Sequence, residues 1–187
     1  MSLTNTSLIS QDANIGVDVI IGSFCVIESG AILHDGVIVE DFSIIQERSV
    51  LGKNSKIGRF TNIGNDVIIG EHCKLTSYCE IRSHCKIGDN VIMGSRCTLS
   101  EGIIVESNVN IKYSTVVTDT PDLSNNDKKL LGVIKEGAKI GANVTIMPGI
   151  NIGKNSEIGA CSQVRHDVPD NEVWYGNPAK FFRKASP

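Results

Sequence analysis

An apolar residue recurs at every sixth position over most of this chain. The series runs without a break from Ile9 to Val117 and resumes from Ile134 to Val164. Val117 and Ile134 are 17 positions apart, so the second series is out of register with the first and something irregular lies between them. A period of six fits neither the turn of an α-helix nor the two-residue alternation of one long strand. It predicts a coil of short parallel strands joined by tight turns.

Two other places in each hexad support this prediction. A small or β-branched residue stands four positions after most of the apolar residues, as at Ala13, Cys25 and Thr61, and Gly often follows directly after them, as at Gly52. We therefore expect one large and one small side chain of each hexad to point into a narrow interior. Gly, Asn and Asp would supply the backbone angles needed at the corners.

With this pattern over roughly residues 9–164, the chain resembles the hexapeptide-repeat acyltransferases, which are left-handed parallel β-helix proteins. The resemblance implies three hexads in each coil, a triangular prism and assembly as a homotrimer. We expect an all-β fold with a left-handed parallel β-helix over residues 1–164, a loop insertion at 118–133 and a capping tail at 165–187. The left hand follows from the resemblance alone, because general rules for parallel crossovers favour the opposite hand.

Composition and charge exclude several other classes of protein. Hydrophobic residues make up 41% of the chain and charged residues 21%, which excludes a disordered protein. The net charge of −3 gives no sign of nucleic-acid binding, and the apolar runs are too short to cross a membrane. The first residues do not resemble a signal peptide, so the cytoplasm is the expected location.

Five of the six cysteines occupy the small inward position of a hexad. A thiol there packs as a small hydrophobic group, and no Cys-x-x-Cys pair suggests a metal site. We therefore predict structural thiols and no metal. These residues are Cys25, Cys73, Cys79, Cys85 and Cys97.

One outward-facing column of the predicted prism is mostly apolar. Such a column favours contact with another chain over scattered surface residues, since four of its five members stack in line. It consists of Ile32, Val50, Ile68, Lys86 and Ile104.

His84 is the first candidate for acid-base chemistry. Asp66 precedes it by one coil, and strands of adjacent coils lie about 4.8 Å apart, so we expect the carboxylate to reach the imidazole and fix its tautomer. Ser83, Glu101 and Asp119 fall on the neighbouring column. The alternative is a solvated corner of alternating charge, because corners of this fold are polar in any case.

The other histidines rank lower. His72 shares a corner column with asparagines and is expected to fill a turn, and His166 is taken as structural. His34, followed by Asp35, is similar to the His-acid pair of some family members and is the second candidate for the base.

The irregular segment is expected to contribute to the site and not only to be a tolerated surface insertion. In relatives that acetylate nucleotide-linked amino sugars, a loop that begins Phe-Thr-Asn-Asp and carries a Pro interrupts the helix at this place. Residues 117–121 read Val-Thr-Asp-Thr-Pro, which differs from that motif at its first and third positions among others.

Small residues one coil apart near the end of the helix predict a place for the acyl donor. Along such a column a flat ligand can lie against backbone amides. In the family this surface receives the pantetheine arm of coenzyme A, and residues 176–180 match the closing motif of the family. Three basic residues of the tail, Lys180, Arg183 and Lys184, could meet coenzyme A phosphates, although the tail could also simply cap the sheet edge. The predicted set is Gly141, Ala142, Gly159, Ala160, Lys180 and Arg183.

These observations predict an acetyltransferase that uses acetyl-CoA as the donor and an amine or hydroxyl of a sugar, nucleotide-linked, as the acceptor. His84 would be the base, oriented by Asp66, and an amide near Gly141 or Ala142 would stabilise the oxyanion. A γ-class carbonic anhydrase has the same fold but needs three zinc-binding histidines, and His72 and His84 fall on different corners. The alternative function is a non-catalytic scaffold whose stacked surface binds a partner chain.

Overall fold

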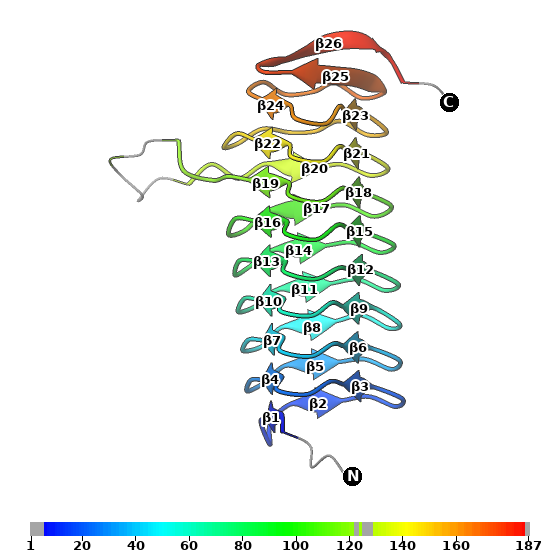
Figure 1. Cartoon of the computed structure of the whole chain (residues 1–187), viewed down its shortest axis with the longest axis vertical. Coiled ribbons are helices and arrows are strands. Elements are labelled where there is room, and N and C mark those ends of the chain that lie inside the picture. Colours follow the sequence, from blue (N-terminus) through cyan, green and yellow to red (C-terminus); the bar gives the residue numbers. More distant parts are fainter. Residues whose placement is uncertain (1–5, 122–123, 125–128, 186–187) are drawn as a thin grey trace.

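The chain winds into a long three-sided prism of parallel β-strands, with the N-terminus at one end and the C-terminus at the other (Figure 1). The computed structural model describes residues 6–121, 124 and 129–185. Within these residues it contains about nine turns and no helix, and therefore no helix long and apolar enough to cross a membrane. The all-β prediction is confirmed.

Each face of the prism is one sheet. The first sheet contains β1 (Leu8–Ile9), β4 (Val26–Ile27), β7 (Ile44–Ile45), β10 (Asn62–Ile63), β13 (Glu80–Ile81), β16 (Thr98–Leu99), β19 (Val116–Val117), β22 (Thr145–Ile146) and β24 (Gln163–Val164). The second contains β2 (Asn14–Ile15), β5 (Ile32–Leu33), β8 (Val50–Leu51), β11 (Ile68–Ile69), β14 (Lys86–Ile87), β17 (Ile104–Val105) and β20 (Val133–Ile134). The third contains β3 (Ile20–Ile21), β6 (Ile38–Val39), β9 (Lys56–Ile57), β12 (Lys74–Leu75), β15 (Ile92–Met93), β18 (Asn110–Ile111), β21 (Lys139–Ile140), β23 (Glu157–Ile158), β25 (Glu172–Gly176) and β26 (Ala179–Lys184).

Strands of adjacent coils pair in parallel with their hexads in register. Ile63 of β10 lies opposite Ile45 of β7 on one side and Ile81 of β13 on the other. Up to β19, residues 18 apart in the sequence are therefore neighbours in space, as the hexad period predicts. The period breaks between β19 and β20, where the chain leaves the prism and returns (Figure 1). Residues 122–123 and 125–128 of the predicted loop lie outside the described residues.

The core is a column of hexad side chains. The large apolar positions are buried from Ile27 to Val164. Small polar residues in the inward position are buried as well, and they satisfy their hydroxyls locally: Ser49 donates to the carbonyl of Gly64 at 2.6 Å. The first coil differs, since Ile9 is 39% exposed and Ile15 is 37% exposed. Among the described residues, this coil has a neighbour on one side only.

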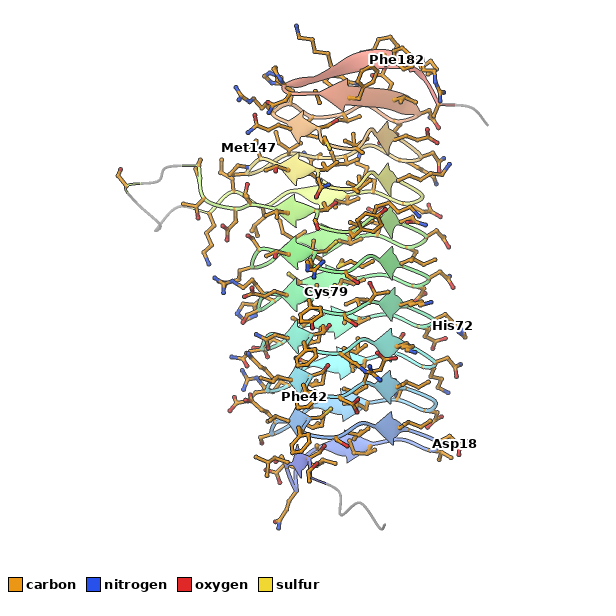
Figure 2. The ribbon with its side chains drawn as sticks, in the orientation of Figure 1. Asp18, Phe42, His72, Cys79, Met147 and Phe182 are labelled. Carbon is orange, nitrogen blue, oxygen red and sulfur yellow. The ribbon has the colours of Figure 1, made fainter. Side chains whose placement is uncertain are left out.

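The burial predicted for the cysteines in the small inward position is confirmed. Five are buried in the core, Cys79 among them (Figure 2), whereas Cys161 is exposed. Burial raises the pKa of the Cys79 thiol to about 12 and that of Cys85 to about 11. Thiols with such values are protonated at neutral pH and are poor nucleophiles and metal ligands.

Corners of the prism use left-handed backbone conformations. We call the turns between the first and second sheets the first corner, those between the second and third sheets the second corner, and those between the third and first sheets the third corner. His72 occupies the left-handed position of the second corner with a φ of 56°, as Asn54 and Asn90 do in the adjacent coils. This confirms that His72 fills a turn, and Figure 2 shows it projecting from the outer edge.

An aromatic column at the third corner is not apparent from the hexad pattern. The rings of Phe24, Phe42, Phe60 and Tyr78 stack with centroids 4.9 to 5.1 Å apart, and Phe42 is labelled within this column in Figure 2. All four residues have a positive φ, which is unfavourable for bulky side chains. Face-to-face packing between coils offsets this cost, because each ring shields its neighbours from water.

The predicted outward column lies on the second sheet. Its members belong to paired strands, β5, β8, β11, β14 and β17, so they stack in line as predicted. Ile68 and Ile104 are exposed, while Ile32 and Val50 are half-buried. This apolar stripe therefore lies on the surface of the chain.

An antiparallel hairpin covers the C-terminal end of the third sheet. β25 pairs with β23 in parallel and with β26 in the antiparallel direction. The indole Nε1 of Trp174 donates to Glu172 at 2.8 Å. The tail thus covers an open sheet edge, one of the two roles considered for it.

Candidate active site

His84 and Asp66 occupy equivalent places in two successive coils of the first corner. Both have the left-handed backbone of that corner, with φ values of 63° and 55°. The distance between His84 Nδ1 and Asp66 Oδ2 is 3.8 Å. The structure therefore brings the two predicted residues together, although at a distance that exceeds a direct hydrogen bond.

The principal partner of Asp66 is Arg48, one coil below it. Arg48 Nε and Nη2 donate to the two carboxylate oxygens at 2.7 and 2.9 Å. This bidentate pair is the main reason why the pKa of Asp66 is below its ordinary value. Arg48 precedes Asp66 by 18 residues, the length of one coil, but residue spacing alone does not indicate which neighbour the Asp66 carboxylate contacts.

Glu101 lies on the other side of His84. Its Oε1 is 3.9 Å from His84 Nε2, so the imidazole stands between two carboxylates. Glu101 also binds the ammonium group of Lys129, and this contact lowers the pKa of the Glu101 carboxyl. Lys129 was not predicted, because it belongs to the irregular segment and has no place in the hexad pattern.

A polar cavity of about 530 Å³ opens beside this corner, on the first sheet. Side chains from several coils and from the irregular segment form its walls. They include Asn62, Ser83, Ser100, Glu101, Asp119 and Lys129. Ser83, Glu101 and Asp119 are thus brought together as predicted, whereas His84 and Asp66 are not among the lining residues.

Asp119 is the least exposed of the predicted carboxylates. Its side chain is 17% exposed, it accepts a hydrogen bond from Thr120 Oγ1 at 3.0 Å, and Lys129 Nζ is 4.0 Å away. Glu101, by contrast, contacts both the imidazole and Lys129. Glu101 is therefore the link between His84 and the cavity.

The residues predicted for the acyl donor lie on a different face of the prism. Gly141 and Gly159 line a smaller cavity of about 320 Å³ on the third sheet, together with Asn110, Lys112 and Glu157. The carboxamide oxygen of Asn110 is buried and has no hydrogen-bond partner among the residues that the structure describes. The structure therefore does not bring this group of residues next to His84 within one chain.

Backbone contacts narrow the choice of oxyanion donor. The Gly141 amide donates to the carbonyl of Ile158, and the Gly159 amide donates to that of Trp174, both at 2.8 Å. The Gly141 amide is therefore already hydrogen-bonded to the next coil. Ala142, in the adjoining turn, is the remaining candidate.

The hairpin residues are close to this second cavity. Tyr175 packs over Gly159, since a Cβ atom on that glycine would lie 2.6 Å from the Cβ of Tyr175. Arg183 Nη2 is 3.8 Å from Glu157 Oε2, and Lys180 lies opposite Tyr175 in the hairpin. Ala160 is exposed at the third corner.

The carboxylate beside His34, the second candidate base, already accepts a backbone hydrogen bond. Asp35, which follows His34, accepts a hydrogen bond from the amide of Val17 at 3.0 Å, and this bond is the main cause of its lowered pKa. His34 and His166 are exposed. Over the described parts of the chain, no group of three or more His, Cys, Asp or Glu side chains is arranged to hold a metal ion.

Comparison with known proteins identifies the repeat. The profile described as bacterial transferase hexapeptide (six repeats) matches residues 132–166, and that of the hexapeptide repeat of succinyl-transferase matches residues 85–118. Residues 1–82 match the profile of the GMPPB C-terminal domain.

Curated relatives match parts of the chain. A Saccharomyces cerevisiae protein classed as an acetyltransferase is 35% identical over 107 residues, which cover 52% of this chain and 55% of that protein. Galactoside O-acetyltransferase from Lactococcus lactis is 51% identical over 51 residues, 27% of this chain and 25% of that enzyme. The chain thus matches about half the length of the yeast relative and a quarter of the bacterial one.

Solved structures extend the similarity over the whole coil. UDP-N-acetylglucosamine acyltransferase from Campylobacter jejuni superposes with a TM-score of 0.86, at 16% identity, over 96% of this chain and 73% of that one. At this identity the likeness concerns the fold alone. The hexad register and the two matched profiles show that the chain is built of hexapeptide repeats like those of bacterial hexapeptide transferases.

Proposed function

We propose that the protein transfers an acetyl group from acetyl-CoA to an amine or hydroxyl of a sugar, and that the sugar is nucleotide-linked. The observation that carries the proposal is the polar cavity that joins Glu101 and Asp119 to the His84 corner. Hydroxyl, amide and carboxylate groups line it, and these groups suit an acceptor rich in hydroxyls. The relative from Lactococcus lactis is named for a galactoside acceptor, which agrees with this choice.

In the proposed reaction the acceptor enters the cavity and attacks the thioester carbonyl of the donor. His84 removes the proton of the attacking group, and the carboxylates of Asp66 and Glu101 flank the ring. The N–H of Ala142 stabilises the oxyanion of the tetrahedral intermediate. When the intermediate collapses, the thiolate of coenzyme A leaves and takes up the proton from the imidazolium.

Asp119 would bind and orient the acceptor. Its low exposure and its place in the cavity wall suit a hydrogen bond to a hydroxyl or an amine. A neutral amine needs less base catalysis than a hydroxyl, so orientation by Asp119 and Glu101 would matter most for an amino sugar.

The donor would lie along the cavity of the third sheet. Gly141, Ala142, Gly159 and Ala160 would border the pantetheine arm, and Lys180 and Arg183 would meet the phosphates.

The separation of the two cavities supports a homotrimer. Within one chain the acceptor cavity is on the first sheet and the donor cavity on the third, so a complete site needs surfaces from two chains. The apolar stripe on the second sheet adjoins the His84 corner and would be covered by the neighbouring chain. The proposal therefore places each complete site between two subunits.

An acceptor screen tests the proposed function. Free thiol release from acetyl-CoA is followed with a panel of amino sugars, sugar alcohols and their nucleotide-linked forms, and products are identified by mass spectrometry. We expect enzyme-dependent thiol release matched by one acetylated sugar product. Thiol release with serine or a macrolide and not with any sugar would contradict the assignment of the acceptor.

A further inference from the structure

A buried polar atom without a partner lies in the wall of the cavity on the third sheet. The carboxamide oxygen of Asn110 is buried, and no residue in the described part of the chain donates a hydrogen bond to it. Buried hydroxyls elsewhere are paired: Ser43 donates to the carbonyl of Gly58 at 2.9 Å. Because an unpaired buried acceptor costs free energy, this position favours a molecule that supplies the missing donor.

The neighbouring coils do not supply a donor. Asn110 is the outward residue of β18, and its neighbours in the adjacent coils are Ile92 of β15 and Lys139 of β21. These three strands follow one another along the third sheet (Figure 1). Ile92 has no polar side-chain atom, and the ammonium group of Lys139 binds Glu157 at 2.9 Å. The oxygen of Asn110 is therefore available to a ligand in the cavity.

The rest of the cavity wall restricts the chemistry of that ligand. Two ammonium groups, of Lys112 and Lys139, line it against the single carboxylate of Glu157, so a cationic donor is disfavoured. Gly141 has no side chain there and leaves room for a narrow chain. The missing donor is thus a neutral N–H or O–H group. The pantetheine arm of coenzyme A is narrow and carries two neutral amide N–H groups.

We infer that Asn110 accepts a hydrogen bond from an amide N–H of the pantetheine arm and so positions the acyl donor in the cavity of the third sheet. The inference rests on the proposed function, in which this cavity receives coenzyme A. It adds a strand residue to a donor set that was drawn from small residues of the coil and from the tail. Asn110 binds the donor and takes no part in the making or breaking of bonds.

Calorimetric titration with two probes tests this inference without reference to activity. Coenzyme A carries the pantetheine arm, whereas adenosine bisphosphate is the nucleotide part of the same molecule without the arm. Both are titrated into wild type and Asn110→Leu, because leucine has nearly the shape of asparagine but no acceptor. We expect the dissociation constant of coenzyme A to rise about five- to tenfold in the variant. The dissociation constant of adenosine bisphosphate should not change.

Two further variants serve as controls. Asn14→Leu makes the same substitution at the outward position of β2, which is exposed and belongs to the second sheet, and should leave both dissociation constants unchanged. Asn110→Ala removes the same oxygen without adding a larger apolar side chain. It should weaken coenzyme A binding as Asn110→Leu does, so the test does not depend on how well leucine fits.

The unfolding midpoint of the unliganded protein gives a second readout. Asn110→Leu removes an acceptor that has no partner among the described residues, so its midpoint should be equal to or higher than that of wild type. A lower midpoint would show that the oxygen stabilises the coil itself and would overturn the inference.

The binding outcomes separate the inference from the proposed function. Coenzyme A affinity within about twofold of wild type in the folded Asn110 variants would overturn the inference, because solvent would then satisfy the oxygen equally well. An equal loss of affinity for both probes would also overturn it, since this would indicate a general change of the cavity. If the wild type bound no coenzyme A, the proposed function itself would be contradicted, and the inference with it.

Discussion

Replacement of His84 by asparagine should reduce kcat by about 10²- to 10⁴-fold, the usual contribution of a general base. Asparagine is the suitable replacement because it tolerates the left-handed backbone of the corner, and Asn54, Asn90 and Asn108 occupy equivalent turns. The substitution therefore removes the imidazole with little effect on the coil. Steady-state kinetics with the acceptor found in the screen would measure the loss.

His72→Asn is the matched control for this variant. His72 has the same left-handed turn position, with a φ of 56°, but lies on the second corner away from the polar cavity. We expect its turnover and its unfolding midpoint to equal those of wild type. If His84→Asn retained wild-type turnover while folded, His84 would have no part in the reaction.

Gly52→Ala should lower the free energy of unfolding by about 3 kcal/mol or more, one of the larger effects of a single methyl group. A Cβ atom at this position would lie 2.4 Å from the carbonyl carbon of Gly70 and 2.7 Å from the amide nitrogen of Glu71. Both are backbone atoms of the next coil, so the clash can be relieved only by separating the coils. For a chain of this length the melting temperature should fall by about 10 °C.

Lys53→Ala, at the next residue, provides the control. Lys53 is exposed at the second corner, and its side chain forms a surface ion pair with Asp35 at 3.6 Å, so its loss should cost less than about 1 kcal/mol. Urea denaturation followed by circular dichroism compares the two variants. Equal midpoints for Gly52→Ala and wild type would show that adjacent coils do not pack as closely as described.

Most of the fold could be predicted because the hexad pattern is a direct consequence of stacking. Each apolar residue that points inward, from Ile27 to Val164, must meet another inward residue in the next coil, so the period determines the register. The buried cysteines and the turn position of His72 follow from the same rule. The aromatic column from Phe24 to Tyr78 was missed because hexad reasoning concerns inward positions, whereas these rings lie outside the core.

The candidate site was predicted less completely. The 18-residue repeat shows which residues lie in adjacent coils, but not which side chains form hydrogen bonds or ion pairs. The proximity of His84 and Asp66 followed from their spacing of 18 residues in the sequence. The bidentate ion pair between Arg48 and Asp66 depends on side-chain rotamers, which the spacing does not specify. Lys129 comes from a segment with no repeat, so no column contained it. The placement of the donor residues on another face became visible only with the assignment of strands to sheets.

Calorimetric titration of the wild-type protein with coenzyme A tests the central claim most directly, because it does not require the acceptor to be known. If this coil is an acetyltransferase, coenzyme A should bind saturably with one site per chain, and acetyl-CoA should compete for that site. An absence of heat and of competition at coenzyme A concentrations well above those in cells would contradict the claim. In that case the stacked surface would be better explained as a scaffold that binds a partner chain.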